Sequence, residues 1–168
     1  MAMTKALSSD NYLEPDKAVT MFVRLLPDGR VEPLEAQHLA RALDNLRLAE
    51  CVPEDIRDLY ATAVGCLYYG FFYYPLYALG EEQLFRVCDV AAKARCALSG
   101  WKAKTFAVAI DLLREQGVIP EAEAPRWDAF RHLRNSASHP TFQTLNMPGQ
   151  VVSSAGHVKT AVEGLFGG

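Results

Sequence analysis

A long uncharged run is the feature that most constrains how this chain can fold. The 22 residues from Leu59 to Gly80 contain no Asp, Glu, Lys or Arg and are rich in leucine, phenylalanine and tyrosine. An uncharged and apolar run must be buried, either in a protein core or in a bilayer. Its length is sufficient to span a membrane. Its tyrosines and Pro75 are spread throughout, whereas membrane helices concentrate aromatic residues at the two interfaces. We therefore expect a buried helix–turn–helix and no membrane span.

The remainder of the chain carries the spacing of amphipathic helices. Apolar residues recur every three or four positions, and prolines and glycines stand where helices can begin or end. These signals predict six helices. The first carries Leu39 to Leu46, the second starts at Pro53, and the third runs from Pro75 to about Leu98. The fourth ends at Gly117, the fifth starts at Pro125, and the sixth is a short helix over Val158 to Leu165. The predicted fold class is all-α, an antiparallel helical bundle.

The first 33 residues do not share the helical spacing. The segment Val19–Leu26 is rich in β-prone residues, and Pro27-Asp28-Gly29 is a turn-forming sequence ahead of Arg30 and Val31. We therefore predict an arm or small hairpin over residues 1–33, followed by a single helical domain over residues 34–168.

Cysteine usage and the first residues of the chain bear on its location. The four cysteines, at positions 51, 66, 88 and 96, form no CxxC pair, and a small secreted scaffold usually spaces its cysteines more tightly. Residues Met1–Lys5 lack the apolar core of a signal peptide. Both observations predict a cytoplasmic protein with reduced thiols.

The net charge of −3 argues against a protein coated in nucleic acid, but the charge is unevenly distributed. Residues 1–83 contain 7 Lys and Arg against 13 Asp and Glu, whereas residues 84–140 contain 9 against 6. Attraction of phosphates depends on local rather than total charge, so a basic face in the second segment could still attract phosphates. The same charges could equally lie on solvated helix faces.

The most informative short segment is Arg134-Asn135-Ser136-Ala137-Ser138-His139, which is followed by Pro140. An arginine, a polar residue, three variable residues and a histidine resemble the signature of the HEPN superfamily of helical bundles. The run Tyr69–Tyr77, followed by a charged helix, resembles the tyrosine-rich entry to the long helix of bacterial HEPN-like proteins. Together these features cover about residues 56–166.

The resemblance implies a metal-independent endoribonuclease in the active members of the family. His139 would act as general acid or base on the ribose 2′-hydroxyl or the leaving oxygen, since imidazole titrates near working pH. Arg134 would stabilise charge on the phosphate. The resemblance also implies a protein of toxin or defence type with no cofactor, acting as a homodimer on RNA, with a nucleotidyltransferase-type antitoxin as a further partner.

Three more residues complete the predicted site. Asn135 lies four residues before His139 on the same helical face and could orient it. Active members of the family carry an acidic residue on the preceding long helix that positions the arginine, and Asp89 is the first candidate for this role, with Glu82 second. On an ideal helix Arg134 and His139 lie about 140° apart around the axis, so they converge only if the long arginine reaches across or the helix ends, as Pro140 permits. Pairing of two motifs across a homodimer, which the resemblance implies, is a further way to bring them together.

Other interpretations of these residues compete with catalysis. Arg134 could simply pair with an acidic side chain, and a histidine before proline often caps a helix, so a non-catalytic helical interaction module or structural homodimer is the alternative function. Asp128, His132 and His139 have spacings that metal ligands can have, but Pro140 interrupts the helix and no metal is predicted. The apolar spacing of Trp127 and Phe130 predicts core packing rather than base stacking.

Overall fold

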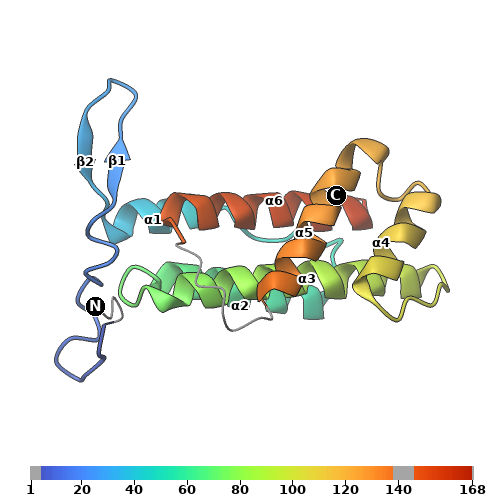
Figure 1. Ribbon diagram of the computed structural model, residues 1–168, viewed down its shortest axis with the longest axis horizontal. Helices are drawn as coiled ribbons and strands as arrows, with labels where there is room; N and C mark the ends of the chain where they lie inside the picture. Colours follow the sequence, from blue (N-terminus) through green and yellow to red (C-terminus); the bar gives the residue numbers. More distant parts are fainter. Residues whose placement is uncertain (1–4, 138–145, 168) are drawn as a thin grey trace.

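The uncharged run folds into a pair of helices. A computed structural model describes residues 5–137 and 146–167 of the chain. In it, α2 (Glu54–Tyr69) and α3 (Pro75–Leu98) run antiparallel, side by side, and are joined by a short turn (Figure 1). The predicted buried helix–turn–helix is confirmed. Within the described residues, every helix is either too short or too polar to cross a bilayer.

The contact between α2 and α3 depends on a glycine. A Cβ atom at Gly80 would lie 2.6 Å from Cδ2 of Leu67 and 3.1 Å from the backbone oxygen of Ala63. Because glycine has no Cβ, the two helix backbones approach closely here. Leu67 is fully buried at this contact, and Tyr77 of α3 is almost fully buried next to Gly70, at the end of α2.

The remaining elements complete a mostly helical structure with a small antiparallel sheet, as predicted. They are β1 (Val23–Leu25), β2 (Val31–Pro33), α1 (Ala36–Leu43), α4 (Phe106–Glu115), the 3₁₀ helix η1 (Glu121–Glu123), α5 (Ala124–Ala137) and α6 (Pro148–Phe166). Helices α1 and α6 form one layer and α2 and α3 the other (Figure 1). Helix α5 crosses this pair of layers at a steep angle, and α4 lies at one end (Figure 1).

Helix α6 corrects two predictions. It is a helix of 19 residues rather than a short one. It also runs parallel to α3, as two hydrogen bonds show. Ser154, near the start of α6, donates a hydrogen bond of 3.0 Å to Glu81, near the start of α3. Arg95, near the end of α3, donates one to the backbone oxygen of Leu165, near the end of α6. An antiparallel arrangement therefore holds for α2 and α3 but not for α3 and α6.

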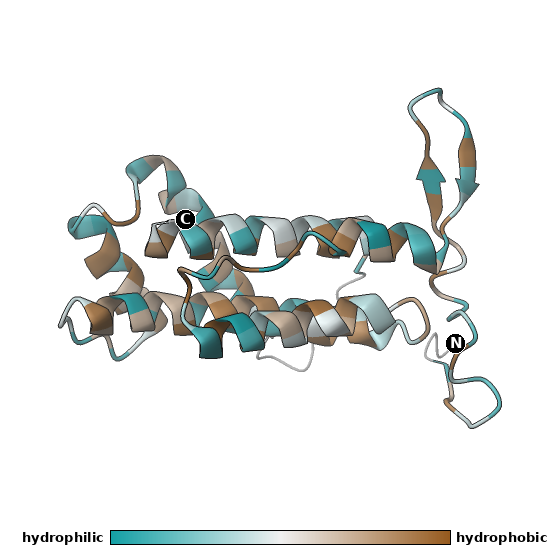
Figure 2. Ribbon diagram, turned by 180° about the vertical axis from the view of Figure 1, so that it is seen from behind, coloured by the Kyte–Doolittle hydropathy of each residue, from teal (hydrophilic) through white to brown (hydrophobic). Residues whose placement is uncertain are grey.

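The N-terminal hairpin is confirmed, with shorter strands than the β-prone segment indicated. Strand β1 pairs with β2 in antiparallel register, Arg24 opposite Glu32, and their side chains form an ion pair of 3.3 Å. Gly29 turns the chain with φ +83°, a conformation that other residues adopt only with strain. Hydrophobic and hydrophilic residues alternate along β1, and both strands stand clear of the helices (Figures 1 and 2).

The chain immediately before the hairpin reaches the core. Val19 is fully buried in a turn rather than in a strand. The carboxylate of Asp16, which is 1% exposed, accepts hydrogen bonds from the backbone N–H groups of Ala18 and Tyr74, at 3.0 and 2.9 Å. Because Tyr74 is the residue before α3, this carboxylate satisfies a donor at the start of that helix. Residues 16–19 thus belong to the packing of the helical domain.

Candidate functional site

Helix α5 is held in place by a chain of aromatic side chains. The ring of Phe106 on α4 contacts Trp127, which contacts Phe130, which in turn contacts Phe85 on α3, with ring-centroid distances of 6.4, 5.8 and 6.3 Å. Trp127 and Phe130 are 2% and 5% exposed, so the prediction that they pack in the core is confirmed. The contact between Phe85 and Phe130 fixes the position of α5 along α3 and its rotation about its own axis.

One helical turn beyond these aromatic residues, an ion pair joins α5 to α3. Arg134 follows Phe130 by four residues, and Asp89 follows Phe85 by four, so both charged residues lie on the contacting faces. Oδ2 of Asp89 lies 3.6 Å from Nε of Arg134, and its Oδ1 lies 2.7 Å from Nζ of Lys93. The Asp89 side chain is 11% exposed, whereas those of Lys93 and Arg134 are 36% and 39% exposed. One buried carboxylate therefore holds two cations at the surface.

The structure brings together two of the five predicted site residues, Asp89 and Arg134. Asn135 is exposed on α5 directly after Arg134. Glu82 is exposed on α3, two turns before Asp89. His139 lies outside the described residues.

Lys93 is a member of this charge cluster that the motif did not indicate. It lies four residues after Asp89 on the same helix. A carboxylate followed by a lysine at this spacing is a recognised helix-stabilising pair, so the sequence did carry a signal for the contact. What the spacing could not indicate is that Arg134, from another helix, shares the same carboxylate.

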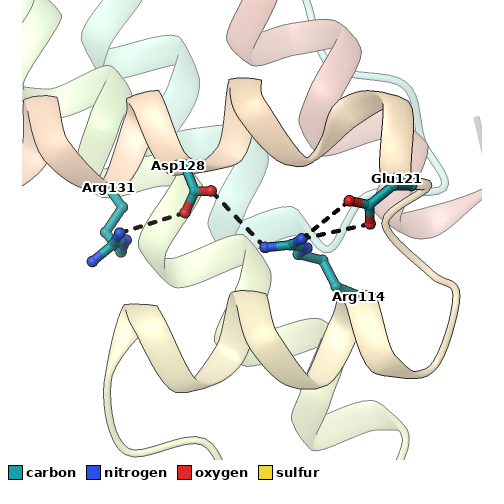
Figure 3. A network of polar contacts seen from close by, with 4 residues as sticks. All are labelled: Arg114, Glu121, Asp128 and Arg131. Atoms are coloured by element: carbon teal, nitrogen blue, oxygen red, sulfur yellow. Dashed lines mark hydrogen bonds and ion pairs between the residues drawn. The ribbon is translucent and has the colours of Figure 1, made fainter.

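A second charge cluster joins α5 to α4 and η1 (Figure 3). Arg114 donates hydrogen bonds to both carboxylate oxygens of Glu121, at 3.4 and 3.5 Å, and its Nη1 lies 3.9 Å from Oδ2 of Asp128. Oδ1 of Asp128 lies 3.5 Å from Nη2 of Arg131. The carboxylate of Asp128, considered above as a metal ligand, is thus engaged by two arginines, and a metal ion would have to displace them.

Two cysteines lie on α3, the helix that carries Asp89. Cys88, next to Asp89, is fully buried, and burial raises the pKa of its thiol far above the usual range. Burial likewise raises the pKa of Cys96. Since the thiolate is the nucleophilic form, neither thiol is suited to nucleophilic catalysis.

The tyrosine-rich run supplies the core of its own chain. Tyr77 is 1% exposed and Phe71 is 6% exposed. Tyr68 donates a hydrogen bond of 2.8 Å to Asp44, while Tyr69 is 61% exposed. The run therefore leaves less apolar surface for a partner than its composition suggests.

Comparisons with family models, with curated proteins and with solved structures returned no match for the chain. The resemblance of residues 56–166 to the HEPN superfamily therefore remains a hypothesis, which depends on the motif and on the geometry around Arg134.

Proposed function

We propose that this chain is a HEPN-like protein of toxin or defence type that binds and cleaves RNA without a metal ion, as a homodimer in the cytoplasm. The observation that carries the proposal is the contact of 3.6 Å between Asp89 on the long helix α3 and Arg134. The resemblance implies an acidic residue on the long helix that positions the arginine, and Asp89 is the first candidate for this role. In this role Asp89 is a positioning residue, because it acts through Arg134.

The charge and exposure of the pair support phosphate binding. Arg134 has a planar group of five N–H donors, of which the Nε side faces Asp89. A side chain that is 39% exposed can be reached by an anion from solution. Because the guanidinium is oriented before the substrate arrives, it can stabilise the charge that develops on the phosphate without reorganisation.

The proposed reaction balances without a cofactor. The neutral imidazole of His139 takes the proton of a ribose 2′-hydroxyl, whose oxygen attacks the adjacent phosphorus. The bond from phosphorus to the 5′-oxygen of the next nucleotide breaks, and that oxygen receives a proton from an acid, for which a second copy of His139 in a homodimer is the candidate. The products are a 2′,3′-cyclic phosphate and a free 5′-hydroxyl.

The homodimer is proposed to form over the α3–α5 face. Val90 and Leu133, the sequence neighbours of Asp89 and Arg134, are 40% and 47% exposed. Apolar residues beside a charge cluster are a common composition for an interface. Pairing across this face would bring the motifs of two copies together.

Incubation with unstructured RNA in excess EDTA tests the proposal. The wild-type protein should cleave it, and His139→Ala should abolish cleavage. An oligonucleotide with 2′-deoxyribose at every position should resist, because the attacking hydroxyl is missing. Cleavage that requires a divalent cation, or that survives His139→Ala, would contradict the mechanism.

A second candidate function, a non-catalytic interaction module, is favoured by the hairpin. Val23, Leu25 and Val31 share one face of its two strands and are 60% to 71% exposed. Exposed apolar residues grouped in this way often mark binding surfaces. A protein that cleaves no RNA would leave this function ahead.

A further inference from the structure

The charge cluster around Asp89 carries more positive charge than its carboxylate can neutralise. Lys93 and Arg134 each contribute one positive charge, and Asp89 contributes one negative charge. The two cations contact different oxygens of the same carboxylate, so they lie close to each other although they come from different helices. The shared carboxylate therefore holds two like charges close together.

Burial differs between the members of the cluster in a way that favours an incoming anion. The Asp89 side chain is 11% exposed, whereas the side chains of Lys93 and Arg134 are more than three times as exposed. An anion that approaches from solution therefore meets one ammonium and one guanidinium group before it meets the carboxylate. Neutralising the excess charge would lower the mutual repulsion of the two cations.

We propose that Lys93 is a second phosphate-binding residue, which together with Arg134 holds a phosphodiester of single-stranded RNA. The proposal rests on the function proposed above and adds a residue to its site. The two groups have complementary properties: a guanidinium presents a planar set of donors, and an ammonium is a compact point charge on a flexible stem. Asp89 then positions both of them.

The salt dependence of RNA binding tests this role. The probe is a short single-stranded 2′-O-methyl RNA, which cannot be cleaved through its 2′-oxygen, so that binding is measured apart from the reaction. Lys93→Gln should weaken binding about 5- to 10-fold at low salt and reduce the slope of log K against log salt by about 0.7, the value for one lost phosphate contact on a single strand. Lys93→Arg should restore the slope, because the charge is retained.

Lys104→Gln is the matched control. Lys104 is exposed in the loop before α4, and its substitution removes the same charge. It should leave the slope as in the wild type. An equal reduction by Lys104→Gln would overturn the proposal, since the effect would then reflect the total charge.

A second probe, inorganic pyrophosphate, separates this proposal from the proposed function. If the wild type binds and cleaves RNA and Lys93→Gln does so with an unchanged slope, the role of Lys93 is wrong and the proposed function stands. If pyrophosphate binds and depends on Lys93 while RNA is neither bound nor cleaved, the anion site stands and the function on RNA is wrong. Binding of neither probe would overturn both.

Discussion

Asp89 and Asp128 make similar contacts in two different regions of the molecule. Each carboxylate bridges two cations, and each bridge links α5 to another helix. The Asp128 side chain is 43% exposed, however, against 11% for Asp89. The cluster around Asp128 also contains Glu121, so its two arginines are balanced by two carboxylates (Figure 3).

The difference shows that an ion pair acquires a functional meaning from burial and charge balance. An exposed and neutral cluster is screened by solvent and serves to fasten α5 to α4. A buried carboxylate that contacts two cations orients both of them, and this group of three side chains carries two positive charges and one negative charge. The same residue types therefore build a structural fastening at one end of α5 and a candidate anion site at the other.

The largest expected effect separates two arginines of α5, Arg134 and Arg131, in catalysis. Arg134→Ala should lower the rate of RNA cleavage about 100- to 1000-fold, because it removes a preorganised donor to the phosphate. Arg131→Ala removes the same charge from the balanced cluster, three residues away, and should leave the rate near that of the wild type. Single-turnover cleavage assays measure both. Equal losses of cleavage rate in the two variants would show that the two clusters do not differ in their role in catalysis.

A smaller effect separates the two aspartates in stability. Asp89→Asn should lower the free energy of unfolding by about 1–3 kcal/mol, less than a fully buried pair would lose, because its two cations reach solvent. Asp128→Asn should cost about 0–1 kcal/mol, since its cluster is exposed. Urea unfolding of the two variants gives the comparison. A larger loss for Asp128→Asn would show that burial of the carboxylate does not determine how much each cluster stabilises the fold.

The smallest effect concerns Glu81, a carboxylate of α3 that is bonded to the hydroxyl of Ser154. Burial raises the pKa of Glu81 above its ordinary value of 4.5, and the Ser154 hydrogen bond opposes part of the rise. A raised pKa means that ionised Glu81 weakens the folded state at neutral pH, and that this penalty disappears as the pH falls through the folded pKa towards 4.5.

Glu81→Gln should therefore raise the free energy of unfolding slightly at pH 7, by less than the changes above, and the gain should fade below pH 4.5. Urea unfolding from pH 4 to pH 8 measures it. Glu82→Gln, at the exposed neighbouring position, controls for removal of charge from α3. A gain that grows as the pH falls would reverse the assigned sign.

Part of the candidate site could be predicted from the sequence. The motif singled out Arg134, and the resemblance to a family with an acidic residue on the long helix led to Asp89. The contribution of Lys93 to the cluster could not be predicted in the same way, because an i,i+4 pair is common on exposed helices and has no meaning until a third charge shares it. That third charge comes from α5, whose position depends on the packing of Phe85 against Phe130.

Local signals determined the limits of several elements. Pro75 starts α3 and the turn at Gly29 closes the hairpin, because proline and glycine restrict or release backbone angles whatever surrounds them. Tertiary structure decided the length of α6 and its parallel course along α3. Its glycines and serines weaken the helical pattern, and the helix is stabilised by the burial of residues such as Val158 against the other helices. Such burial depends on segments that are distant in the sequence and pack together only in the folded protein. The local sequence pattern of α6 therefore could not predict its length.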